Sequence, residues 1–103
     1  MTNYFQPHIP RATRVAVNLL LLYRRTSERD WLAARIVNLS ESGALFAPSD
    51  LQPGTPVEVI LWPREPVAGF ASGKQVCEAE VVRVTEAGAA AVRFEECRFV
   101  LEV

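Results

Sequence analysis

Two arginines near the N-terminus have side chains suited to a small anionic ligand. Arg11 and Arg14 stand three positions apart in a proline-containing segment. A guanidinium binds phosphate through two parallel hydrogen bonds, and it also reaches O6 and N7 of a guanine or stacks on the base. The pair therefore predicts binding of a phosphate or a purine. The alternative is that both arginines are solvated charges on a flexible arm.

A second group of candidate residues lies in the segment Asn38-Leu-Ser-Glu-Ser-Gly43. The Asn38 amide oxygen can accept a hydrogen bond from a guanine N–H, and the Ser40 hydroxyl can both donate and accept. Gly43 permits close backbone approach and tolerates a positive φ. The same residue types also close turns through side-chain-to-backbone hydrogen bonds, so a purely structural role for Asn38 and Ser40 stays open. Both interpretations place the segment at a turn.

Charge and residue content exclude several classes of function. The 103-residue chain has 11 Lys and Arg against 12 Asp and Glu, a formal net charge of −1. A protein that follows a nucleic-acid backbone needs a basic surplus, so we expect no DNA or RNA partner. The lone histidine, His8, lies in the N-terminal segment, and no carboxylate pair stands out. We therefore predict that the chain is not an enzyme, binds no metal and needs no cofactor.

The cysteines and the hydropathy pattern bear on the compartment. Cys77 and Cys97 are the two cysteines, and we expect reduced, mostly buried thiols, with a disulfide as the alternative. The longest apolar run, Leu19 to Leu22, is far shorter than the roughly 20 residues that span a bilayer. Residues 1–10 lack the apolar region of a signal peptide. These features predict a cytoplasmic protein without membrane insertion.

Short strands are the elements that must position the candidate residues. Alternating hydrophobicity and regular turn signals predict strands at 15–25, 31–38, 43–47, 57–62, 76–85 and 89–94. Polar positions change face within 76–85, which indicates a β-bulge or a barrel corner. Residues 95–103 fit either a helical turn or a strand. Six short strands without an amphipathic helix predict an all-β fold, a six-stranded antiparallel barrel, because closure removes exposed sheet edges.

The length of the chain predicts a single domain with one modest core. We expect an irregular N-terminal arm over residues 1–13, where Pro7 and Pro10 oppose regular helix, followed by the barrel over 14–103. The alternation within the strands also predicts which side chains fill the barrel. These are Val17, Leu19, Leu21, Ile36, Val59, Leu61, Val82 and Phe94.

Four segments of the chain, in their order and spacing, resemble the PilZ domain family. The first opens the first strand, the second matches the family's [D/N]-x-S-x-x-G motif between its second and third strands, and the others resemble the entry to the next long strand and the closing hairpin. The segments are Arg14-Val-Ala-Val, Asn38-x-Ser40-x-x-Gly43, Leu51-Gln-Pro-Gly-Thr-Pro-Val-Glu-Val, and Val81-Val-Arg-Val with Gly88 and Ala91-Val-Arg-Phe94. The resemblance covers residues 11 to 95.

The resemblance implies a receptor for cyclic di-GMP, a bacterial second messenger with two guanines and two phosphates. It also implies that the receptor relays the signal to a partner, an effector protein. The ligand-binding residues that it implies are Arg11, Arg14, Asn38, Ser40 and Gly43. An arm that becomes ordered around the ligand would suit such a switch.

One position of the arm departs from the family pattern. The family carries R-x-x-x-R just before its first strand, and Arg14 holds the second arginine position. Pro10 occupies the first, while Arg11 lies one residue closer. This departure favours an alternative, a degenerate PilZ domain that does not bind cyclic di-GMP and acts only as a protein–protein interaction module. The intact Asn38-to-Gly43 motif favours the receptor.

Overall fold

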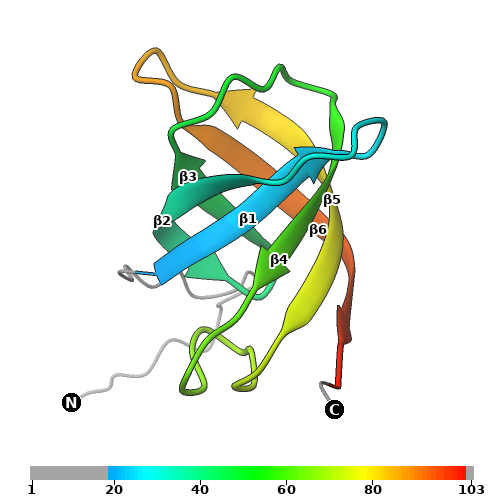
Figure 1. Ribbon diagram of the computed structural model, residues 1–103. Coiled ribbons are helices and arrows are strands. Elements are labelled where there is room, and N and C mark those ends of the chain that lie inside the picture. The colour runs from blue at the N-terminus through cyan, green and yellow to red at the C-terminus, as the bar shows by residue number, and fades with distance from the viewer. Residues whose placement is uncertain (1–18, 102–103) are drawn as a thin grey trace, which may run out of the picture.

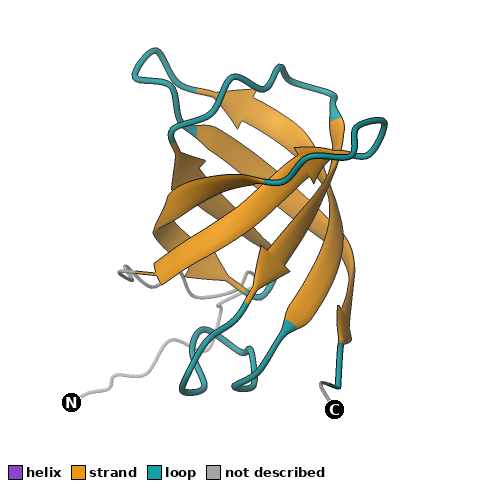
Figure 2. Ribbon diagram, viewed as in Figure 1, coloured by secondary structure: helices purple, strands orange, loops and turns teal. Residues whose placement is uncertain are grey.

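The computed structural model describes residues 19–101, which form strands joined by turns and loops (Figures 1 and 2). The strands are β1 (Leu19–Arg25), β2 (Leu32–Ser40), β3 (Gly43–Ala47), β4 (Pro56–Leu61), β5 (Gln75–Val84) and β6 (Ala90–Phe99). No helix occurs between residues 19 and 101, so this part of the chain has no helical segment that could cross a membrane.

The six strands form one closed antiparallel barrel in the order β1-β2-β3-β6-β5-β4. Strands that follow each other in sequence pair directly, except at the connection 48–55, which crosses one end of the barrel from β3 to β4 (Figure 1). Pairing of β4 with β1 then closes the sheet. Each described strand thus has a partner on both sides for at least part of its length, which protects most of the sheet edge. The predicted all-β, six-stranded antiparallel barrel is confirmed.

The strand limits follow the predicted ones with a few differences. β3 has the predicted bounds, and β2 continues to Ser40 instead of ending at residue 38. β6 runs on to Phe99, so the first half of the uncertain segment 95–103 is strand. The predicted start of the first strand at residue 15 lies outside the described residues.

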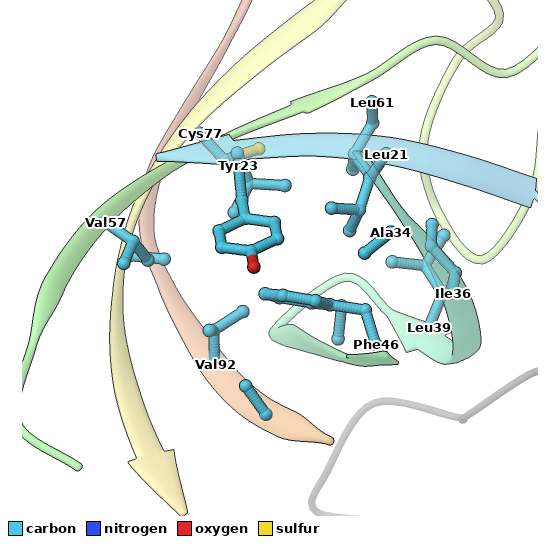
Figure 3. Packing of buried hydrophobic residues seen from close by; sticks show 14 of the residues in the cluster. Leu21, Tyr23, Ala34, Ile36, Leu39, Phe46, Val57, Leu61, Cys77 and Val92 are labelled. Carbon is cyan, nitrogen blue, oxygen red and sulfur yellow. The ribbon is translucent and has the colours of Figure 1, made fainter. Parts of the chain in front are cut away.

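Alternation along β1 separates the interior of the barrel from its outer surface. Leu21 and Tyr23 are almost fully buried, whereas Leu20 and Leu22 are 57% and 40% exposed. The Tyr23 ring packs against Phe46 with ring centroids 5.0 Å apart (Figure 3). Burial raises the pKa of the Tyr23 hydroxyl, and the carboxylate of Asp50 raises it further. The phenol therefore stays neutral inside the barrel at physiological pH.

Most of the predicted core residues contact the core. Leu19 and Phe94 are partly buried against it, and Val17 lies outside the described residues. The predicted residues that are fully buried are Leu21, Ile36, Val59 and Leu61.

Val82 is a wrong core prediction, because its side chain is 47% exposed. The register between β5 and β6 shifts between Val81 and Arg83, so β5 carries an extra residue there. Cys77, Ala79 and Val81 are buried, so alternation along β5 already places Val82 on the outer face, and the bulge leaves Arg83 there as well. The predicted bulge in this strand is therefore present, with Val82 as its extra residue on the outer face.

Cys77 and Cys97 lie opposite each other on β5 and β6 and form a disulfide. The expectation of two reduced thiols is therefore wrong for this structure. The sequence did not reveal the pair because residues 20 positions apart meet only once the register of the hairpin is set. Disulfides are rare in cytoplasmic proteins, so this pair is unusual for the predicted cytoplasmic location.

Candidate functional site

The motif residues Asn38, Ser40 and Gly43 lie together on the β2–β3 hairpin. Asn38 and Ser40 belong to β2, Gly43 begins β3, and the turn between them is Glu41 and Ser42. The expectation that the whole segment is a turn is therefore corrected. The Ser40 hydroxyl lies 3.0 Å from the Ser42 hydroxyl and also accepts a hydrogen bond from the Ser42 N–H. Ser40 thus stabilises the hairpin, which bears out the structural role that the sequence left open for it.

A β-bulge in β2 directs Asn38 to the outer face of the barrel. Ile36 points into the core, and simple alternation would turn Asn38 inward as well. The register between β2 and β3 shifts between Ile36 and Asn38, so that Asn38 lies opposite Leu45. The next residue, Leu39, then takes the interior position and is fully buried. The extra residue therefore presents the Asn38 amide outside the core.

The sheet register aligns the motif with residues from β5 and β6. Residues directly opposite on neighbouring strands share a face of the sheet, so pairing defines rows across it. One row runs from β2 to β5 through Asn38, Leu45, Ala91 and Arg83. The next row runs through Ser40, Gly43, Arg93 and Glu80. Polar groups therefore stand on both sides of a floor made of small or apolar residues.

The outer face of the barrel is hollowed along these two neighbouring rows. A hollow of about 410 Å³ is lined by residues of β2, β3, β5 and β6 together with Ser42. Asn38 and Ser40 stand on one side, and Arg83 and Arg93 on the other. A cavity of this size is in the range of small-molecule sites in proteins.

Gly43 lets β3 approach β6 closely at the floor of the hollow. A Cβ atom at this position would lie 2.2 Å from the carbonyl oxygen of Val92, a backbone atom that cannot turn aside. Gly43 does not have a positive φ, so its tolerance of that conformation is not used here, whereas the expected close backbone approach is present. Close packing of the two strands, and the space left above them, is what requires glycine here.

The charges at the hollow are unevenly paired. Arg93 Nη2 lies 2.8 Å from Glu80 Oε1 and 3.8 Å from Glu95 Oε2. Within residues 19–101, by contrast, no carboxylate pairs with Arg83 and no side-chain hydrogen bond uses the Asn38 amide. Among the described residues, nothing therefore competes with a ligand for the Arg83 guanidinium or the Asn38 amide.

The structure brings together only part of the predicted site. It assembles Asn38, Ser40 and Gly43, while Arg11 and Arg14 lie outside the described residues. Sequence reasoning missed Arg83 and Arg93 as lining residues. Both occur in the segments that resemble the closing PilZ hairpin, but only the register of β5 and β6 shows that they stand across from Asn38.

The family of the chain follows from a comparison with known protein families. The family model described as PilZ domain matches residues 9–102. The chain belongs to the PilZ domain family. PilZ domains are receptors for cyclic di-GMP and form a ligand-binding family, not an enzyme family. The hollow of this PilZ domain contains the family's [D/N]-x-S-x-x-G motif as Asn38, Ser40 and Gly43.

A solved structure supports the fold of this PilZ domain. The structure is the PilZ domain of CeSA from a cellulose-synthesizing bacterium, with a TM-score of 0.61 and 16% sequence identity over 82% of each chain. At this identity the likeness concerns the fold alone. No curated protein matches the chain.

Proposed function

We propose that this PilZ domain binds cyclic di-GMP in the hollow on the outer face of β2, β3, β6 and β5. The observation that supports the proposal best is the meeting of Asn38, Ser40 and Gly43 at one hollow. The family relationship gives the ligand, and the lining residues supply the chemistry that it needs. The Asn38 amide suits the N–H and carbonyl groups of a guanine, and the arginines suit phosphates.

The N-terminal arginines complete the proposed site. Arg14 holds the second arginine position of the family's R-x-x-x-R pattern, and Arg11 stands one residue closer to it than the family's first arginine. In our proposal Arg14 binds a phosphate or a guanine of the ligand. Gly43 leaves room for the ligand because it has no side chain at the floor of the hollow. The occupied site then signals to an effector protein.

The compartment that suits this ligand is the cytoplasm. A disulfide is unusual there, and the Cys77–Cys97 pair would be reduced by the cytoplasmic thiol systems. The β5–β6 ladder continues on both sides of the pair, from Gln75 opposite Phe99 to Val84 opposite Ala90. Backbone pairing therefore holds the hairpin in register with or without the bond.

A second function is favoured by one residue. Pro10 stands where the family carries its first arginine, and proline offers neither a charge nor an N–H donor. A PilZ domain that has lost cyclic di-GMP binding would act as a protein–protein interaction module only. The two functions differ in whether the hollow binds cyclic di-GMP.

Shift mapping by nuclear magnetic resonance distinguishes the two functions. We expect cyclic di-GMP to move the amide signals of Asn38 to Gly43 and of Ala91 to Arg93, because these residues form the hollow. The signals of β4, which lies across the barrel next to β1, serve as the internal control. Shifts confined to β4, or no shifts at a high ligand concentration, would contradict the proposed site.

A further inference from the structure

One cation at the hollow is already occupied by a carboxylate of the same chain. Arg93 lines the hollow, but its Nη2 hydrogen-bonds Glu80 Oε1 at 2.8 Å. Glu80 lies directly opposite Arg93 on β5 and is not among the residues that line the hollow. The ion pair therefore holds the Arg93 guanidinium toward β5, beside the space that the ligand would fill.

The neighbouring arginine provides a contrast. Arg83 lines the same hollow from the next row of the sheet, opposite Ala91. In the part of the chain that the structure describes, it has no ion pair. Arg83 is thus ready to receive an anion, whereas Arg93 must first leave Glu80.

The Glu80–Arg93 pair is suited to an exchange of partners. The two side chains are 38% and 56% exposed, and exposed ion pairs are weak because water screens them. A phosphate offers a guanidinium the same bidentate geometry as a carboxylate does. A bound ligand with two phosphates would also lie near the Glu80 charge and be repelled by it.

We propose that Glu80 competes with the ligand's phosphate for Arg93 and so weakens binding at this site. The inference rests on the proposed function, and it adds a residue that sets the affinity from outside the hollow. Glu80 acts here as an internal substitute for the phosphate. Removing its charge breaks the shorter of the Arg93 ion pairs and ends the repulsion from Glu80, and only the longer contact with Glu95 at 3.8 Å stays. The hollow keeps all of its lining residues.

The test compares two matched variants on the same strand. Glu80→Gln and Glu78→Gln remove the same charge from β5, but Glu78 pairs with Arg98, which does not line the hollow. We expect Glu80→Gln to bind cyclic di-GMP about two- to fivefold more tightly than wild type, in line with the loss of one exposed ion pair. Glu78→Gln should bind as wild type does. Calorimetric titration at one fixed salt concentration measures both, and melting curves confirm that both variants fold.

Each outcome of the titration decides the inference. Tighter binding by Glu80→Gln alone supports it, and so does binding by Glu80→Gln where wild type is silent. If wild type binds and Glu80→Gln binds no more tightly, the inference is overturned and the proposed function stands. Equal gains in both variants show a general charge effect and also overturn it. Silence of wild type and Glu80→Gln alike overturns the inference together with the proposed function.

Discussion

Replacing Leu21 by alanine is expected to lower the free energy of unfolding by about 2–5 kcal/mol. Leu21 is 2% exposed and belongs to the core cluster inside the barrel. It sits in the middle of β1, opposite Ala34 on β2 and Leu61 on β4, where the barrel closes. Shortening the side chain removes apolar contacts and leaves a cavity that a closed barrel cannot collapse around. Urea unfolding followed by circular dichroism measures the change.

The neighbouring residue gives a matched control for this prediction. Leu20→Ala makes the same chemical change one position away, on the outer face, where the side chain is 57% exposed. Its expected cost is below about 1 kcal/mol, because little apolar surface leaves the core. Equal losses in the two variants would contradict the assignment of inner and outer faces along β1.

Replacing Arg14 by alanine is expected to weaken cyclic di-GMP binding about ten- to hundredfold. A charge-assisted bidentate contact contributes about 1.5–3 kcal/mol, and each 1.4 kcal/mol is about tenfold in affinity. The melting temperature of the free protein should stay nearly unchanged. Arg11→Ala should cost less affinity, because Arg11 does not stand at the family spacing. Titration calorimetry of the three proteins measures the order of the effects.

The opposite change, adding an arginine at Pro10, tests whether the arm can raise the affinity for cyclic di-GMP. Pro10→Arg places an arginine four residues before Arg14 and removes the fixed φ of proline. If the arm limits affinity, this variant binds more tightly than wild type, or binds where wild type does not. If Pro10→Arg and Arg14→Ala both leave cyclic di-GMP binding unchanged, any ligand binds elsewhere, and the protein–protein interaction module becomes the better interpretation.

The sequence predicts the barrel well because its signals are local. Alternation in β1 places Leu21 and Leu20 on opposite faces without reference to other strands. The apolar run Leu19 to Leu22 suggests that both faces are covered, but the 57% exposure of Leu20 shows that one is not. The residues of the β2–β3 hairpin are close in sequence, so the motif could be located on it before the fold was known. The number of strands and their order along the chain follow from the same local patterns of alternation and turn residues.

What the sequence does not predict depends on register. The bulge after Ile36 turns Asn38 outward, and the bulge after Val81 keeps Arg83 on the outer face, yet the residue at which each register shift occurs is fixed only when the strands pair. Arg83 stands across the hollow from Asn38 only because β3 pairs with β6 and β6 with β5. The Cys77–Cys97 disulfide depends on the same pairing. These features are long-range consequences of barrel closure.

Calorimetric titration of the purified protein with cyclic di-GMP tests the central claim most directly. We predict saturable binding that Asn38→Ala weakens by about three- to tenfold, since one hydrogen bond to the ligand is lost. Arg98→Ala, on β6 but outside the hollow, should bind as wild type does. An absence of binding heat at a high ligand concentration by a folded wild-type protein, or binding unaffected by Asn38→Ala, would contradict this claim.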